Sequence, residues 1–514
     1  MPGTKSVRFS TQSAWLIGAA GFALFWIIAR AVLQSITIDE ADAYDVFVWR
    51  TNPAHWEASS VNHLVNSLLM RLFVSLFGLS AFTVRLPSLI GAAIYILASY
   101  RLVRLLIQEW MLQWPLFVCL AYNPFIMDHL VAGRGYSLGV GCLLGAIALA
   151  ASASSSGDAS KSPSDIYRTC CWCSLLLAVS FCSTFSFAVV DAVAAIFIFA
   201  WFARRPGVRT ARLLLACCGP GLALTGFLAG SILADWRHIS LAWGARTLGE
   251  TARSVIESSY YEPSPYLLNP FLYGVVTRWS YLILPLLGVS CMAYWVWIWR
   301  EREHWRSKPA ARWTAAWGLS AAGILAFALG IHRLMYRFGH ILMPLGRRAI
   351  FIVPLCMLAI GALLALRTAS RTSAYLRRGA LVMLWVTAAY FLCCLRLTYF
   401  MEWKYNADAR ELYQVVAWYN HAYGVRDVGS NWRYIAVLNF YRILSGRESL
   451  PEITGEPVPR LAEYPLKKQL YVVHYESDAP FIDRERLKVV YHNPETGAAV
   501  AIRPAVESAG CSTP

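Results

Sequence analysis

Two stretches near the N-terminus decide the fold: residues 14–33 read AWLIGAAGFALFWIIARAVL, and residues 38–44 read IDEADAY. The first has the length that crosses a bilayer as a helix, about 17–25 apolar residues. The second brings Asp39, Glu40 and Asp42 to the mouth of that helix. A carboxylate held at a membrane surface is a candidate functional group, either a general base or a metal ligand. The alternative is a solvated acidic loop.

The composition of the whole chain predicts a polytopic α-helical membrane protein. Of its 514 residues, 57% are hydrophobic and 15% are charged, and the mean hydropathy is +0.46. Soluble domains carry about 25% charged residues. The first apolar run is longer than a signal-peptide core and has no small-residue cleavage site, so we expect a retained helix with its N-terminus in the cytoplasm.

The net charge of +16 comes largely from loops and does not indicate a nucleic-acid partner. Basic residues gather at residues 204–212, 300–312 and 367–378, between apolar segments. Such clusters are typical of cytoplasmic loops that contact anionic lipid. Most of the 13 cysteines lie inside apolar segments without metal-ligand spacing, so we expect them to be small core residues.

About eleven apolar spans are expected. Alternating them from a cytoplasmic N-terminus puts every basic loop inside and the C-terminus outside. Residues 169–202 contain no clear break, and we divide them into two spans. The expected spans are Ala14–Leu33, Phe82–Tyr100, Trp110–Leu130, Tyr136–Ala153, Thr169–Ser186, Phe187–Phe202, Leu213–Ala234, Trp279–Trp299, Trp313–Ile331, Ala349–Leu366 and Gly379–Leu397.

Residues 1–400 are thus predicted to form the transmembrane part, in which no internal repeat indicates a transporter of two matched halves. Its first outer loop, residues 34–81, carries the acidic cluster and an amphipathic helix from Val61 to Leu76 that is expected to lie along the membrane surface. From about Met401 the composition becomes that of a soluble protein. Residues 401–514 are predicted to form a small extracytoplasmic α/β domain, with a helix at 408–423 and strands at 469–474, 487–491 and 498–503.

Four arginines at outer helix ends go against the positive-inside trend: Arg85, Arg134, Arg347 and Arg348. Arginine at such positions favours a planar anionic partner, either a carboxylate or a phosphate. With the acidic cluster, the set suits a phosphorylated lipid whose head group reacts at the membrane surface. The carboxylate would activate an acceptor hydroxyl, and the arginines would hold the leaving phosphate. The alternative is that each arginine snorkels or pairs with a carboxylate of the chain.

Several motifs appear in a fixed order. Residues 38–41 read IDEA, residues 62–66 read NHLVN and residues 77–87 read FGLSAFTVRLP. Further on come NP at 123–124, RGYSL at 134–138, and the segment 344–354 with its arginine pair. This pattern resembles the GT-C glycosyltransferases, membrane enzymes that use polyprenyl-phosphate sugars and include protein O-mannosyltransferases, aminoarabinose transferases and lipopolysaccharide-core galacturonosyltransferases. The chain departs from many relatives at residues 61–64, where they carry His-Pro-Pro-Leu or Glu-Lys-Pro-Pro.

The resemblance implies a catalytic acidic residue that corresponds to Asp39, with Glu40 beside it as a supporting partner or metal ligand. It also implies arginines that contact the lipid phosphate, and a divalent metal is left open. His63 is either a metal or phosphate contact or a cap of the amphipathic helix. The candidate substrate-binding residues are His63, Arg85, Asp128, Arg134, Tyr136, Arg347 and Arg348.

The resulting hypothesis is a multi-pass GT-C-type glycosyltransferase of a bacterial cytoplasmic (inner) membrane, with its site on the outer face. It would move a sugar from a polyprenyl-phosphate carrier to a glycolipid, polysaccharide or protein, with Asp39 as the base. Three alternatives stay open: a transporter or flippase for lipid-linked glycans, a catalytically inactive scaffold, and a ligase that moves whole glycans. A transport path predicts ionisable residues at mid-membrane, whereas here they collect at outer helix ends.

Overall fold

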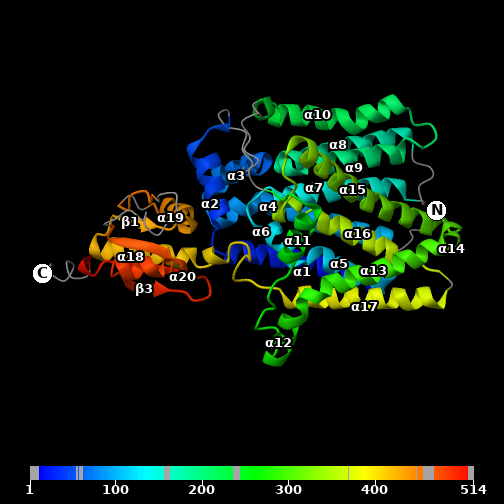
Figure 1. Ribbon diagram of the computed structural model, residues 1–514. Coiled ribbons are helices and arrows are strands. Elements are labelled where there is room, and N and C mark those ends of the chain that lie inside the picture. Colours follow the sequence, from blue (N-terminus) through cyan, green and yellow to red (C-terminus); the bar gives the residue numbers. More distant parts are fainter. Residues whose placement is uncertain are drawn as a thin grey trace, which may run out of the picture.

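The computed structural model describes residues 11–53, 56, 62–155, 162–234, 244–368, 370–446, 449–454 and 468–506. Val61, where the amphipathic helix was predicted to begin, lies outside these ranges. A long bundle of helices makes up most of the molecule, and the C-terminal residues form a smaller unit at one end of it (Figure 1). The polytopic helical architecture predicted from composition is therefore confirmed.

Ten helices in the described ranges are long and apolar enough to cross a membrane. Residues 163–202 form two of them, as predicted, because the chain turns through the short helix η3 (Phe185–Phe187). The ten are α1 (Thr11–Leu33), α4 (Ala81–Leu106), α7 (Tyr136–Ser154), α8 (Pro163–Ser183), α9 (Ala188–Phe202), α10 (Thr210–Ala234), α12 with α13 (Pro270–Trp279, Ile283–Arg300), α15 (Pro309–Gly339), α16 (Ile352–Ala365) and α17 (Arg371–Cys393).

The span predicted at Trp110–Leu130 is not one helix, and here the prediction was wrong. It consists of α5 (Trp110–Ala121) and α6 (Pro124–Val131). Asn123 restarts the helix, because its side chain accepts hydrogen bonds from the amides of Phe125 and Ile126 at 3.0 and 3.2 Å. Proline at the first helical position has no amide to lose there.

The basic loops all lie at one end of the bundle, here called the basic end. Arg205 and Trp313 both donate to the carbonyl of Ser154, at 3.1 and 3.0 Å. At the same end, Arg367 and Arg377 pair with Glu109 at the start of α5. Because α6 ends among the residues of the candidate site, α5 and α6 together extend from the basic end to the opposite end of the bundle.

Helix α3 (Leu64–Phe77) turns its polar side inward. Asn66 and Ser67 are buried, and Asn66 Nδ2 donates to the carbonyl of Gly133 at 3.1 Å. Leu72 and Leu76 are exposed by 48% and 62%. An exposed apolar face is typical of a helix that lies in a membrane surface, and the placement of α3 along the membrane stays a prediction.

The C-terminal unit is a mixed sheet with three helices. The sheet has the order β1-β2-β4-β3, in which β1 runs parallel to β2 and the other pairs are antiparallel. The predicted helix and the three predicted strands are present, whereas β1, α19 and α20 were not predicted. The elements are α18 (Ala409–Tyr423), β1 (Val428–Ser430), α19 (Trp432–Ser445), β2 (Leu470–His474), α20 (Tyr475–Arg484), β3 (Lys488–His492) and β4 (Ala498–Ile502).

This unit packs over the short helix α2 (Ile38–Tyr44). Asn406 accepts a hydrogen bond from the amide of Ile38 at 2.9 Å, and the Tyr441 hydroxyl accepts one from the amide of Ile36 at 3.2 Å. The C-terminal unit thereby covers the end of the bundle opposite the basic end, here called the site end.

Candidate functional site

Helix α2 begins with a capping box that fixes its orientation. The Thr37 hydroxyl accepts from the amide of Glu40 at 3.3 Å, and the Glu40 carboxylate accepts from the amide of Thr37 at 2.8 Å. These reciprocal bonds satisfy two amides that a helix start otherwise leaves without partners. They also turn Glu40 into the protein, away from the direction taken by Asp39.

Glu40 and Arg85 form an ion pair whose side chains are both 0% exposed. Arg85 Nε and Nη2 each lie 2.8 Å from a Glu40 carboxylate oxygen. Arg85 also donates to three backbone carbonyls at the end of α1, those of Ala31, Gln34 and Ser35. Burial alone would raise the pKa of Glu40, but Arg85 outweighs it and the pKa lies below its ordinary value.

Glu40 and Arg85 therefore satisfy one another and the surrounding backbone. Neither side chain reaches the surface on which a metal or a phosphate would bind, in contrast to the metal-ligand and substrate-binding roles predicted for them. We assign both a positioning role: they hold α1, α2 and α4 (Ala81–Leu106) together beneath the site.

The loop between α6 and α7 is held by tight contacts around two glycines. The Gly133 amide donates to Glu40 Oε1 at 2.6 Å. A Cβ atom on Gly135 would lie 1.9 Å from the carbonyl oxygen of Ser183, so no larger residue fits there without a shift of the backbone. Arg134 stands between these two glycines, and its position is therefore fixed by the fold.

Arg134 is a buried cation, 3% exposed. Its Nη1 donates to the backbone carbonyl of Asp39 at 3.0 Å, and its Nε has no hydrogen-bond partner in the described ranges. Within the same ranges no carboxylate lies in ion-pair contact with it. A buried guanidinium without a full carboxylate partner is suited to accept an anionic ligand.

Arg347 joins two carboxylates. It stands in η6 (Gly346–Ala349), where its Nη1 donates to Asp39 Oδ2 and lies 2.9 Å from Glu402 Oε1. The rings of Trp403 and Tyr136 lie 5.4 and 5.9 Å from the Arg347 guanidinium carbon. The side chains of Asp39 and Arg347 are 22% and 24% exposed, so both can be reached by a ligand. Asp39, Arg134, Arg347 and Glu402 are here called the charged cluster.

Both carboxylates of the cluster are ionised near neutral pH. Burial raises the pKa of Asp39, but the guanidinium groups of Arg134 and Arg347 outweigh burial and hold that pKa below its ordinary value. The pKa of Glu402 is lowered against burial in the same way, by His129 and Arg347. The neighbouring Asp42 differs: partial burial and the charges of Asp39 and Asp45 raise its pKa to about 6.

Two histidines stand behind the cluster. His63 Nδ1 is 2.8 Å from the carbonyl of Ser183, and burial together with the nearby Arg134 holds its pKa well below the ordinary value, so the ring is neutral. Its side chain does not cap α3. His129 Nε2 lies 3.4 Å from Glu402, and the Tyr136 ring contacts both imidazoles edge-on.

Asp128 lies apart from these contacts. Asp128 is 1% exposed and is bound by Arg30 at 2.5 Å, by the Tyr261 hydroxyl and by the amide of Met401 at 2.9 Å. It is saturated, and we reassign it from substrate binding to holding the bundle against the C-terminal unit. Arg348 lies beside Arg347 in η6, where its amide donates to the carbonyl of Leu345 at 3.3 Å.

Of the residues predicted for the site, the structure brings Asp39, Arg134, Tyr136 and Arg347 together, with His63 behind them. It adds Glu402, His129 and Trp403, which the sequence reading missed. Glu402 carried a usable signal, because it is an acidic residue directly after the last apolar span, at the same end as Asp39. In the described part of the chain, no three His, Cys, Asp or Glu side chains gather closely enough to hold a metal ion.

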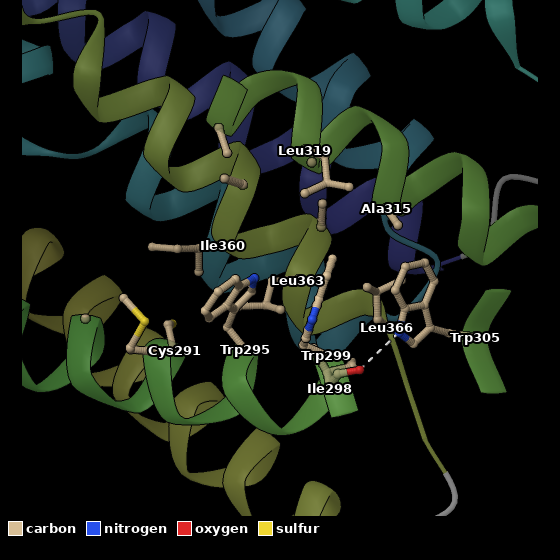
Figure 2. Close-up of a pocket in the computed structure, with 16 residues that line it drawn as sticks. Cys291, Trp295, Ile298, Trp299, Trp305, Ala315, Leu319, Ile360, Leu363 and Leu366 are labelled. Carbon is tan, nitrogen blue, oxygen red and sulfur yellow. Dashed lines mark hydrogen bonds between the residues drawn. The ribbon is translucent and has the colours of Figure 1, made fainter. Parts of the chain in front are cut away.

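The apolar groove in Figure 2 does not belong to this site. It is a cavity of about 400 Å³ between α13, α15 and α16, lined by apolar side chains such as Trp295, Leu319 and Ile360. Trp305 at its edge donates to the carbonyl of Ile298 at 3.3 Å. No charged residue lines this cavity.

The fold and the charged cluster define a polytopic membrane protein with a group of charged side chains at one end of its helices. No family model matches the chain, and no curated protein matches it significantly. Solved structures similar to it include ArnT, an archaeal oligosaccharyltransferase and an arabinofuranosyltransferase.

Three of these structures show how far the likeness extends. ArnT from Cupriavidus metallidurans bound to undecaprenyl phosphate is 12% identical, with 96% of this chain and 99% of that chain covered and a TM-score of 0.48. The Archaeoglobus fulgidus oligosaccharyltransferase is 12% identical, with 97% and 75% covered and a TM-score of 0.42. The arabinofuranosyltransferase AftD from Mycobacteria is 14% identical, with 95% and 40% covered and a TM-score of 0.44. The similarity to these structures is distant and concerns the path of the backbone.

Proposed function

We propose that this protein is a glycosyltransferase that moves a sugar from a polyprenyl-phosphate carrier to an acceptor at the outer face of a bacterial cytoplasmic membrane. The observation that carries the proposal is the charged cluster itself. Arg347 contacts two partly exposed carboxylates, those of Asp39 and Glu402, and the buried cation Arg134 lies beside them at the site end of the bundle. A lipid-borne phosphate would pair with the guanidinium groups of this cluster in planar hydrogen-bonding geometry.

The two arginines would hold the carrier phosphate. The exposed side of Arg347 can donate to a phosphate oxygen, and the buried guanidinium of Arg134 adds positive charge behind it. During transfer, the bond between the sugar carbon and the phosphate oxygen breaks, and negative charge grows on that oxygen. Donors already fixed in place stabilise such charge in the transition state more than in the ground state.

Asp39 would act as the base. As the acceptor oxygen forms its bond to the sugar carbon, its proton passes to the Asp39 carboxylate. In the free protein, Arg347 keeps the pKa of Asp39 low. When a phosphate engages Arg347, one cause of that low pKa weakens, so Asp39 becomes a better proton acceptor once substrate is bound. Glu402 would keep Arg347 in place from the other side.

The position of the charges disfavours a transporter or flippase. Charged residues inside the predicted spans stand near the helix ends, as do Arg30, Arg85 and Asp191. A transport path needs polar groups at the middle of the membrane.

The test is transfer from a panel of radiolabelled polyprenyl-phosphate sugars in proteoliposomes with a crude envelope acceptor fraction. Asp39→Asn is expected to reduce transfer by about 10²–10⁴-fold, the usual contribution of a positioned base. The matched control is Asp42→Asn, one turn further along the same helix, which should keep most of the activity. Thermal unfolding of both variants checks that they fold.

Equal transfer by wild type and Asp39→Asn would refute the assignment of the base. Loss of transfer in Asp42→Asn alone would move that role to Asp42. No transfer by any form, across all donors, would refute the proposed reaction and favour the scaffold.

A further inference from the structure

A second cavity of about 510 Å³ opens at the site end, on the other side of the segment that leads into the C-terminal unit. It is here called the second pocket. Its walls come from residues 262–267 and 395–399, with Trp26, Tyr273, Lys404 and Glu495 completing the lining. None of the charged cluster lines it.

Arg396 is the buried cation of the second pocket, 9% exposed. Its guanidinium donates to the carbonyls of Cys394 and Glu262 and to the Tyr399 hydroxyl. The rings of Tyr261 and Tyr399 lie 5.0 and 4.7 Å from its central carbon. All these partners are neutral, and no carboxylate of the described ranges lies in ion-pair contact with it.

The charge of Arg396 is thus held by neutral hydrogen-bond acceptors and aromatic rings and not by a direct ion pair, although Glu262 and Glu495 line the same pocket. A buried guanidinium of this kind binds an anionic ligand with a favourable free energy, because it has already been desolvated during folding. Lys404 adds a second cation that stands 5.1 Å from the centre of the Tyr399 ring. Two carboxylates, Glu262 and Glu495, lie exposed at the rim, where they can accept hydrogen bonds from hydroxyl groups.

The surroundings point to a ligand that comes from the membrane. Trp26 belongs to the membrane-spanning helix α1, and Tyr273 belongs to α12. Next to the pocket, Leu267 and Phe271 are exposed by 56% and 77%. In Figure 1, α12 projects from the side of the bundle near this end. Exposed apolar residues beside a cationic pocket suit a lipid with its head group inside and its chains in the bilayer.

Residues 395–404, here called the strap, separate the second pocket from the charged cluster. Glu402 and Trp403 contact Arg347 on one side of the strap. Tyr399 and Lys404 line the second pocket on the other side. The second pocket and the charged cluster therefore lie on the two sides of one short segment.

We propose that the second pocket binds the head group of an anionic, hydroxyl-bearing membrane lipid, which presents the acceptor for transfer. The phosphate or carboxylate of this lipid is bound by Arg396 and Lys404, and its hydroxyl groups by the rim carboxylates. The proposal of a lipid-binding site depends only on the residues of the second pocket. The proposal that this lipid is the acceptor depends in addition on the proposed function.

The test measures lipid binding to the purified full-length protein in detergent by native mass spectrometry. The probes are phosphatidylinositol, with one phosphate and a hydroxyl-rich ring, phosphatidylcholine as the zwitterionic comparison, and undecaprenyl phosphate. Arg396→Gln is expected to weaken phosphatidylinositol binding by about tenfold, as for loss of a charge-assisted contact. Lys404→Gln, which alters a partly exposed side chain, should weaken it less. The control is Arg410→Gln, an exposed arginine outside the pocket.

The two sites are told apart by a second pair of measurements. Arg347→Gln should weaken undecaprenyl phosphate and leave phosphatidylinositol unchanged, and Arg396→Gln should do the reverse. The proposal for the second pocket is refuted if neither Arg396→Gln nor Lys404→Gln weakens phosphatidylinositol binding. It is also refuted if Arg347→Gln weakens that binding. If Arg396→Gln weakens the binding of undecaprenyl phosphate, the donor site of the proposed function is refuted, whereas the second pocket is kept as a lipid-binding site. Arg396→Lys, which keeps the charge, should retain binding if the loss in Arg396→Gln is not a folding defect.

Discussion

Arg347 sets the protonation of Asp39, and this gives a prediction at the scale of one residue. In the wild type, the pKa of Asp39 lies below its ordinary value, so the carboxylate stays ionised until the pH falls through that low value. In Arg347→Gln, the contribution of Arg347 to the low pKa of Asp39 is lost, while that of Arg134 remains, and the pKa rises. The acidic limb of the rate–pH profile should therefore move to higher pH. Transfer rates between pH 4 and 8 measure this shift.

The conservative variant supplies the control. Arg347→Lys keeps a cation near Asp39 and should leave the acidic limb closer to its wild-type position, even if the rate falls because the planar geometry is lost. Superimposable profiles for wild type and Arg347→Gln would show that Arg347 does not tune Asp39.

Adjacent residues show what the sequence could and could not reveal at this scale. The pattern singled out Asp39 and Glu40 together, and both are where a membrane-surface site was predicted. It could not tell that Glu40 is buried, because that depends on a partner, Arg85, 45 residues later in the chain. It also could not join Glu402 to Asp39, since the two meet only through Arg347.

At the scale of elements, the Glu40–Arg85 pair holds three helices in register. Glu40→Gln leaves Arg85 buried without its counter-charge, which typically costs roughly 3–5 kcal/mol. We expect a clear drop in the thermal midpoint of the detergent-solubilised protein, with loss of activity because α2 is displaced. Static light scattering during heating would measure the midpoint.

Glu257→Gln is the matched control for this prediction. It removes an equally charged residue from an exposed helical pair with Arg253, and such pairs contribute little. A midpoint for Glu40→Gln as high as that of Glu257→Gln would contradict the positioning role.

The break between α5 and α6 illustrates how hydropathy can mislead about an element. Residues 110–130 are mostly apolar, so composition alone joins them. The local signal was Asn123 followed by Pro124, a cap and a first helical residue, which only the conformation of the backbone reveals as a restart. This restart brings His129 to the charged cluster.

For the whole molecule, the structure separates the basic end from the C-terminal unit, and this predicts their accessibility. Single substitutions Lys308→Cys and Asp483→Cys place a thiol at each end, on exposed residues. With a membrane-impermeant maleimide on intact cells, we expect labelling of Asp483→Cys alone, and labelling of Lys308→Cys only after permeabilisation. The unsubstituted protein gives the background from native cysteines. Labelling of both positions in intact cells would contradict the predicted topology.

The overall architecture was the most predictable level, because bilayer thickness and loop charge constrain it strongly. The docking of the C-terminal unit was not predictable. It depends on contacts such as Ile38 with Asn406 and Arg30 with the carbonyl of Tyr399, which join residues more than 300 positions apart. No local pattern in the sequence marks such partners.

The strap has a consequence for how the protein would handle two ligands. Tyr399 and Lys404, which line the second pocket, lie in the same short segment as Glu402 and Trp403, which contact Arg347. A ligand that shifts Tyr399 or Lys404 would therefore also shift the backbone that carries Glu402 and Trp403. Any such coupling is reciprocal by thermodynamic necessity, so each ligand changes the affinity of the other by the same factor. The strap would then determine the order in which the two ligands bind and the cooperativity between them. A substitution in the strap that changes one binding site would also change the other.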